Sequence, residues 1–162
     1  MPLLSHGIAL ERHQALLLVS GTPKGRGVFA KSAIPAGTII ETCPVLIFPL
    51  GDLERLKATL VDQYSYNWPV RDAVSGKVAV TQALALGLGS MFNHARDQNV
   101  GFRRDGEKEV IVYRTLRDVQ AGEELCISYG AHLWFEEVDA GREEVGEWDE
   151  ELPLEAIRVD KD

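Results

Sequence analysis

Short apolar segments separated by turn residues run along most of the chain, and this pattern predicts short β-strands. A β-branched run follows the turn residues at 35–37, and the segments 99–103 and 109–115 flank an Asp-Gly pair, which is typical of a hairpin turn. Further strands are expected within 8–20, at 28–31, around Val78 and Val80, and at 125–129. The glycine-containing segment 21–27 is expected to be a loop. We therefore predict a mainly β protein.

Three segments carry helical patterns instead. A helix over 52–63 is predicted because its apolar residues Leu53, Leu56, Leu60 and Val61 fall on one face, with an aspartate at its N-terminal end. Residues 82–92 predict a short helix or helical turn, which two glycines interrupt, and residues 131–137 predict another short helix. The expected architecture is thus a set of small sheets with a few short helices.

An internal similarity supports sheets over a helical bundle. The segments AIPAGTII at 33–40 and DVQAGEEL at 118–125 share an apolar residue, an Ala-Gly pair and a second apolar residue at the same spacing. Two similar turns that lead into two strands are expected of several β-rich folds. The similarity therefore bears on the fold more than on the activity.

Length and composition bound the class of protein. A chain of 162 residues fits one domain, and 45% hydrophobic with 26% charged residues is typical of a globular protein. No apolar run approaches the ~20 residues that span a membrane. Cys43 and Cys126 are too few for a disulfide framework or a four-thiolate zinc site, so we expect buried free thiols. An intracellular protein is expected, in the nucleus or the cytoplasm.

The net charge of −8 is unevenly distributed. Residues 136–162 carry 12 acidic and 3 basic side chains, whereas residues 1–135 carry 13 and 14. An acidic tail of this kind is usually solvated, but it can also attract a basic partner such as a lysine-rich substrate. No basic stripe is present, so direct nucleic-acid binding is not expected.

Three motifs in a fixed order carry the candidate chemistry. They are KGRGVFA at 24–30, GSMFNHARDQNV at 89–100 and EELCISYG at 123–130. Each is weak alone, but together they resemble the SET-domain family of protein lysine methyltransferases, over roughly residues 8–135. The cysteine clusters that flank many histone-directed members are missing, so the chain resembles a minimal SET domain.

The resemblance implies a fold and a domain division. It implies a β-clip of short curved sheets with a C-terminal pseudoknot, in which the segment ending in Tyr129 passes through a loop formed by an earlier segment. This would bring the Asn-His pair at 93–94 next to that strand. Residues 1–135 would form the SET domain, and residues 136–162 an acidic segment that docks on the domain or on a partner subunit.

The family's reaction is methyl transfer from S-adenosylmethionine to an amine, which is a direct displacement in which positioning dominates. Tyrosines that line a narrow channel would orient the lysine nitrogen, and burial would disfavour its charged form. No metal is needed, and His6, His13, His94 and His132 show no ligand spacing. The resemblance places the cofactor beside residues of all three motifs, namely Lys24, Gly25, Arg26, Gly27, Asn93, His94, Tyr129 and Trp134.

The resemblance also assigns the catalytic residues and the substrate channel. Tyr129 matches the catalytic tyrosine, although it could also be a tyrosine at the rim. Tyr66, or less readily Tyr64, resembles a second channel tyrosine, and core packing beside a tryptophan is an equal alternative. Ile127 lies two residues before Tyr129 on the same strand face and would wall the channel, or simply belong to the core. Because isoleucine lacks a hydroxyl there, we expect an enzyme that is not restricted to monomethylation.

Some residues depart from the family's pattern or admit another role. Gln98 replaces a proline that commonly precedes the closing asparagine Asn99, and Ser128 replaces an aspartate that commonly precedes the tyrosine. Both changes put the fine geometry in doubt. Trp134 would cover the adenine, or be a core tryptophan. His94 would contact the adenine edge, or only hold its turn.

Three functions follow. The first is a lysine methyltransferase that acts on a protein, such as a histone tail. The second is a catalytically degenerate module that binds a peptide or partner, and the third is a structural β-clip domain without cofactor. The substrate surface would come from the 41–80 insert, the C-terminal segment or a second subunit. A homodimer is expected because the tail carries apolar residues, which are Trp148, Leu152, Leu154 and Ile157.

Overall fold

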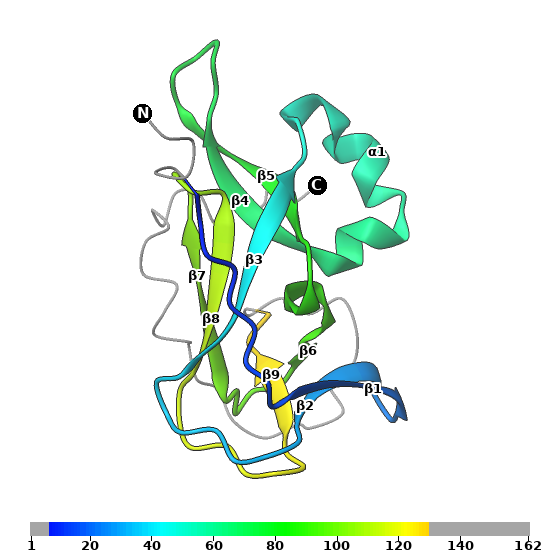
Figure 1. Cartoon of the computed structure of the whole chain (residues 1–162). Helices are drawn as coiled ribbons and strands as arrows, with labels where there is room; N and C mark the ends of the chain where they lie inside the picture. The colour runs from blue at the N-terminus through cyan, green and yellow to red at the C-terminus, as the bar shows by residue number, and fades with distance from the viewer. Residues whose placement is uncertain (1–6, 130–162) are drawn as a thin grey trace.

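A computed structural model describes residues 7–129 of the chain (Figure 1). Its strands are β1 (Leu16–Thr22), β2 (Gly25–Ala30), β3 (Ile39–Ile47), β4 (Ser65–Arg71), β5 (Val78–Ala85), β6 (Asn93–His94), β7 (Val100–Asp105), β8 (Val110–Thr115) and β9 (Glu124–Ile127). Its helical segments are η2 (Leu50–Asp52), α1 (Leu53–Lys57), η3 (Leu60–Tyr64) and η4 (Leu88–Met91). The predicted mainly β class is confirmed. The predicted helix at 131–137, Trp134 and the acidic tail lie outside the described residues.

The strands form two sheets. One has the order β1-β2-β9-β6 and the other has the order β4-β5-β3-β8-β7. Neighbouring strands run antiparallel, except that β6 and β9 pair in parallel. The predicted hairpin is confirmed as β7 and β8, which pair from Val100 with Thr115 to Asp105 with Val110. The first sheet therefore joins segments from the two ends of the described chain, as Figure 1 shows for β1, β2 and β9.

The predicted loop at 21–27 was wrong. Strands β1 and β2 form a hairpin whose last pair is Thr22 with Gly25, so the KGRG motif begins a strand. The Thr22 hydroxyl donates to the Gly25 carbonyl at 2.7 Å and closes the turn. Gly25 has a φ of 86°, which glycine adopts without steric cost. The turn itself is limited to residues 23–24, and the glycines that suggested a longer loop lie in the strands on its two sides.

The predicted helix over 52–63 is mostly wrong. Only α1 is α-helical, and Thr59 is extended with φ −120° and ψ 159° before η3 begins. Leu56 is buried, whereas Leu60 is 66% exposed, so the apolar face meets the core at one turn only. The prediction of a short helix or helical turn over 82–92 is correct only in part, because β5 continues to Ala85 and the helical turn η4 follows it.

The two similar turns predicted from the sequence pair with each other. The backbone N–H groups of Ile34 and Val119 each donate to the other's carbonyl at 2.9 Å. Gly37 and Gly122, which stand at equivalent places in the two turns, both have positive φ. Each turn then leads into a strand, β3 and β9 respectively. The prediction of two similar turns that feed two strands is confirmed.

The core lies between the two sheets and includes η4. Its largest fully buried side chains are Tyr113, Phe92, Ile34, Ile40, Ile111, Leu125 and Ile127. Cys43 and Cys126 are free and buried, as predicted. No helix among the described residues is both long and apolar enough to cross a membrane. The core therefore packs directly beneath the segment that leads into the Asn-His pair.

Candidate functional site

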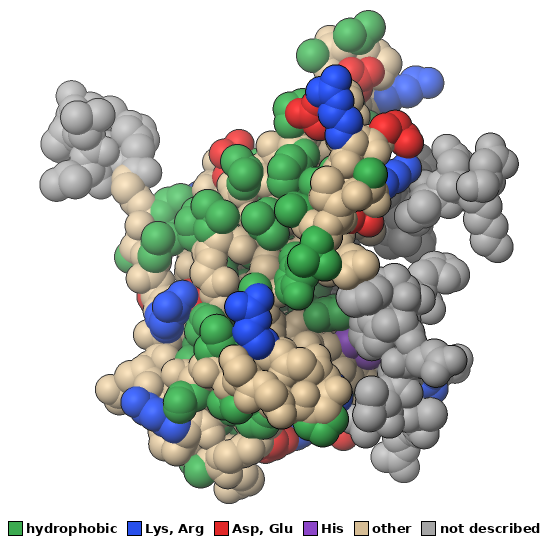
Figure 2. Space-filling view, turned by 90° about the vertical axis from the view of Figure 1, so that its right-hand side faces the viewer, with side chains coloured by type: hydrophobic (Ala, Val, Ile, Leu, Met, Phe, Trp, Pro, Cys, Tyr) green, Lys and Arg blue, Asp and Glu red, His purple; other side chains and the backbone are tan. Residues whose placement is uncertain are grey.

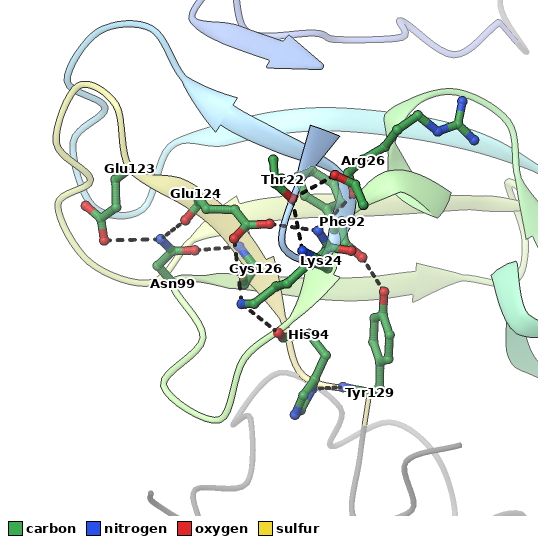
Figure 3. Close-up of polar contacts among 12 residues, drawn as sticks. Thr22, Lys24, Arg26, Phe92, His94, Asn99, Glu123, Glu124, Cys126 and Tyr129 are labelled. Atoms are coloured by element: carbon green, nitrogen blue, oxygen red, sulfur yellow. Dashed lines mark hydrogen bonds and ion pairs between the residues drawn. The ribbon is translucent and has the colours of Figure 1, made fainter. Parts of the chain in front are cut away.

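The parallel pairing of β6 with β9 creates the candidate site. Asn93 pairs with Cys126 and His94 pairs with Ile127, although the two segments lie more than thirty residues apart in sequence. The Ala95 N–H extends the ladder by donating to the Ile127 carbonyl at 3.1 Å. The expected proximity of the Asn-His pair and the tyrosine strand is confirmed, and Figure 3 shows His94 beside Tyr129. The threading of the last segment through a loop stays a prediction.

Asn93 connects this pair to the first motif. Its side-chain Nδ2 donates to the Arg26 carbonyl at 2.9 Å and to Oε1 of Glu124 at 2.8 Å. These bonds join β6, β2 and β9 through one amide. The predicted cofactor residues Arg26 and Asn93 are therefore in direct contact, and it is the Arg26 backbone that takes part.

His94 is a buried link between the Asn-His pair and the tyrosine. It is 7% exposed, and its Nδ1 accepts a hydrogen bond from the Tyr129 backbone N–H at 3.0 Å. A nitrogen that accepts carries no proton, so in the neutral ring the proton is on Nε2. The ring centroids of His94 and Tyr129 are 5.4 Å apart. Displacing His94 would therefore also displace the backbone of Tyr129.

Lys24 reaches the same place from the β1–β2 turn. Its Nζ lies 3.4 Å from the His94 carbonyl oxygen and 3.6 Å from Oε2 of Glu124. The Lys24 side chain is 20% exposed, so its charge is close to the surface. The structure thus gathers Lys24, Arg26 and His94 around Glu124 and Tyr129 (Figure 3). Asn93 joins this group through its bonds to Arg26 and Glu124.

Gly27 is required for space. A Cβ built on it would lie 2.5 Å from Oε1 of Glu124 and 2.8 Å from Nδ2 of Asn93. Both distances are shorter than such contacts allow. A side chain at Gly27 would therefore expel the two groups that hold this part of the site together.

Tyr129 lies at the edge of the site with its hydroxyl directed inward. The hydroxyl donates to the Phe92 backbone carbonyl, and the residue is 37% exposed. Burial raises the pKa of the Tyr129 phenol to about 12, because it disfavours the phenolate. The phenol is therefore neutral at physiological pH and suits a role in orientation.

Tyr66 is tied to the same segment as Tyr129. Its hydroxyl donates to the Gly89 carbonyl at 2.5 Å. Its ring packs edge-on against Phe102 at 5.2 Å and lies 6.4 Å from the Tyr113 ring. Burial raises the pKa of the Tyr66 phenol. The geometry fits both the channel role and the core role that the sequence allowed.

The other predicted channel residues lie in different environments. Tyr64 is 36% exposed, and its carbonyl accepts a hydrogen bond from the Ser90 hydroxyl at 3.1 Å. Ile127 is 1% exposed and belongs to the core cluster. Tyr64 thus stands towards the surface and Ile127 stands inside.

Asn99 binds the backbone of the tyrosine strand. Its Nδ2 donates to the Glu124 carbonyl at 2.8 Å, and its Oδ1 accepts from the Cys126 N–H at 2.8 Å. Asn99 is 3% exposed. This amide takes the place of a strand partner, which is the kind of brace that the resemblance implied.

Sequence reasoning missed Glu124, Phe92 and Gly89 as parts of the site. Glu124 stands in the EEL motif, but only the strand register shows that its carboxylate faces Asn93. Phe92 and Gly89 contribute backbone carbonyls, which carry no signal in side-chain identity.

Comparisons with known proteins agree with this geometry. The family described as SET domain matches residues 25–130 of this chain. "Histone-lysine N-methyltransferase, H3 lysine-37 specific" of Schizosaccharomyces pombe is 47% identical over 139 residues, which cover 84% of this chain and 88% of that protein. Among solved structures, a Plasmodium falciparum protein provisionally described as a histone methyltransferase superposes with a TM-score of 0.54 at 22% identity, covering 76% of this chain and 99% of that one. CpSET8 from Cryptosporidium superposes with a TM-score of 0.53 at 20% identity, covering 75% and 60%. The two structures support the fold.

Proposed function

The chain belongs to the SET-domain family of protein lysine methyltransferases, and on that premise we propose that it methylates histone H3, at lysine-37, in the nucleus. Its activity is the transfer of methyl groups from S-adenosylmethionine to lysine side chains. The observation that carries the choice of substrate is the 47% identity to a relative named as specific for that lysine.

The residues of the site fit S-adenosylmethionine. The space over Gly27 is lined by polar atoms of Glu124 and Asn93 and by the ring of Phe29. The Lys24 ammonium suits a carboxylate such as that of the methionine part. Bound there, S-adenosylmethionine would supply a methyl carbon that the neutral lysine nitrogen attacks while the carbon–sulfur bond breaks and S-adenosylhomocysteine leaves. We propose that Lys24, Gly25, Arg26, Gly27, Asn93 and His94 hold this cofactor. Trp134, outside the described residues, would cover the adenine.

Tyr129 is proposed to orient the lysine amine. A phenol has one proton, and that of Tyr129 is donated to the Phe92 carbonyl. The phenol oxygen therefore acts towards the substrate as an acceptor and can receive an N–H of the amine. This fixes the direction of the nitrogen lone pair, which is the main requirement of an in-line displacement. Tyr129 does not need to ionise for this role.

Tyr66, Tyr64 and Ile127 are proposed to line the lysine channel. Tyr66 and Tyr129 both bind carbonyls of the segment 89–92, which supports their placement around one space. Ile127 pairs with His94 across the parallel ladder and offers no hydroxyl. An additional methyl group would not have to displace a water held by that side chain, so we propose that the product extends beyond monomethyl-lysine.

The predicted substrate surface on the 41–80 insert is supported by its exposed apolar side chains. Within this segment Leu46 is 51% and Leu60 is 66% exposed, and Tyr64 lies near them in sequence. Figure 2 shows apolar side chains gathered across the middle of one face of the molecule. A face of this kind suits contact with a peptide or protein. The homodimer expected from the acidic tail rests on residues outside the described part and stays a prediction.

The direct test is methyl transfer to histone H3. Recombinant H3 and a matched H3 in which arginine replaces lysine-37 are incubated with the enzyme and labelled S-adenosylmethionine. We expect label on the first and not on the second. Equal labelling of both would refute lysine-37 as the methylated residue. Label on other proteins but not on H3 would refute histone H3 as the substrate. Binding of H3 peptide without transfer would favour the degenerate binding module.

A further inference from the structure

Glu124 occupies a position between two functional motifs. It begins β9 and lies opposite Phe29 of β2. Its Oε1 accepts from Nδ2 of Asn93 at 2.8 Å, and its Oε2 lies 3.6 Å from Nζ of Lys24. The side chain is 19% exposed. Its carboxylate is therefore held on both oxygens by residues of the proposed cofactor site.

The partners of Asn93 determine which way its amide faces. An ionised carboxylate and a backbone carbonyl can only accept hydrogen bonds, and Asn93 faces one of each, on Glu124 and Arg26. The nitrogen of the amide must therefore point at them, and both of its protons are used. Among residues 7–129, no group donates a hydrogen bond to Oδ1 of Asn93. Asn93 can therefore offer a ligand its Oδ1 as a hydrogen-bond acceptor.

Steric contact holds this arrangement in place. The missing Cβ of Gly27 would fall within 3 Å of both Oε1 of Glu124 and Nδ2 of Asn93. The two groups thus occupy the space that a side chain at position 27 would need. Lys24 compensates the charge of the carboxylate from the other side.

We propose that Glu124 is a positioning residue that fixes the polarity of the Asn93 amide, so that Oδ1 receives a hydrogen-bond donor of the cofactor. On S-adenosylmethionine such a donor is an ammonium or a hydroxyl group. A glutamine at position 124 could donate as well as accept, so that only the Arg26 carbonyl would still oppose the flipped amide. This inference rests on the proposed cofactor site and adds a residue that acts through Asn93.

The test is a double-mutant cycle in the full chain. Calorimetry measures the Kd of S-adenosylmethionine for wild type, Glu124→Gln, Asn93→Ala and the double variant. We expect Glu124→Gln to raise the Kd about tenfold, the loss of roughly one charge-assisted hydrogen bond. In the Asn93→Ala background the same change should have no further effect. Because the change acts on cofactor affinity, Glu124→Gln should slow turnover more at subsaturating than at saturating S-adenosylmethionine.

Two controls separate the alternatives. Glu123→Gln changes the neighbouring carboxylate, which contacts Asn99 and Arg117 instead, and should leave the Kd unchanged. A Glu124→Gln effect that persists with Asn93→Ala but vanishes with Lys24→Met would assign the action to Lys24 and overturn the proposal. If Asn93→Ala fails to fold, Asn93→Ser takes its place in the cycle.

A readout without cofactor keeps this proposal distinct from the function itself. In NMR spectra of the cofactor-free protein, the two Nδ2 protons of Asn93 should shift in Glu124→Gln and not in Glu123→Gln. Unshifted signals would overturn the proposal. If the Asn93 signals shift in Glu124→Gln but the wild type binds no S-adenosylmethionine, the proposed cofactor site is refuted. The Glu124–Asn93 contact would then be a structural one.

Discussion

The hydroxyl of Tyr129 donates a hydrogen bond to the backbone carbonyl of Phe92, the residue that precedes the Asn-His pair. The Tyr66 hydroxyl does the same to Gly89, three residues earlier. The two tyrosines thus hold the two ends of one short segment that passes beneath the site. Of the residues proposed to line the channel, these two have phenol groups that the fold holds by hydrogen bonds to the backbone.

Stability should fall as the pH rises above about 10, the usual pKa of tyrosine. Burial raises the pKa of Tyr129 to about 12 and also raises those of Tyr66 and Tyr113. A raised pKa in the folded state contributes stability that is complete below the unfolded value and lost as the pH rises through the folded one. Thermal melts followed across this window should show the decline, and Tyr129→Phe should make it shallower. Phenolate absorbance from Tyr66, Tyr113 and Tyr129 at pH 10 in a folded chain would contradict this.

Tyr66→Phe separates the channel role of Tyr66 from core packing. Removing the hydroxyl leaves the Gly89 carbonyl without its partner and should lower the free energy of unfolding by about 1–2 kcal/mol in either case. If Tyr66 lines the channel, turnover should also fall at a temperature where the variant is fully folded. Denaturant titration and methyl-transfer kinetics measure the two effects. A loss of stability with unchanged turnover would make Tyr66 a core residue.

His94→Ala should impair both cofactor binding and turnover. His94 accepts a hydrogen bond from the Tyr129 backbone N–H, so its loss frees the proposed catalytic tyrosine and removes the proposed cofactor contact. His94→Asn places an amide oxygen near the position of Nδ1 and should recover part of the turnover. Calorimetry and steady-state kinetics compare the two variants at matched folding. If both variants bind S-adenosylmethionine as wild type does, the cofactor role of His94 is wrong.

Ile127→Tyr should shift the product towards monomethyl-lysine. Ile127 is 1% exposed, so the larger ring should also cost about 1–3 kcal/mol of stability through overpacking. Mass spectrometry of the product at long reaction times counts the methyl groups, with Ile127→Leu as the control for disturbed packing. A wild-type product that stops at one methyl group would refute the proposed role.

The elements that the sequence predicted well are those determined by local chemistry. The Asp-Gly hairpin and the two Ala-Gly turns need only residues close in sequence, and both are present. The helix over 52–63 failed because only Leu56 finds a core to pack against. The loop at 21–27 failed because glycine in a tight hairpin turn cannot be distinguished from glycine in a loop.

The candidate site was predictable in its members more than in its contacts. The motifs located Asn93, His94 and Tyr129, which the fold brings together. The contact of Glu124 with Asn93 depends on the register of three strands, two of them from distant segments. No local pattern encodes such a register.

The most direct test of the central claim is the effect of Tyr129→Phe on methyl transfer at saturating S-adenosylmethionine, with cofactor affinity measured on the same preparation. The wild type should label a lysine-containing protein substrate. The variant should turn over about 100-fold more slowly, as expected when a reacting group is mispositioned, and its Kd for the cofactor should be close to that of wild type. A folded Tyr129→Phe variant with undiminished turnover would contradict the claim that this hydroxyl orients the amine.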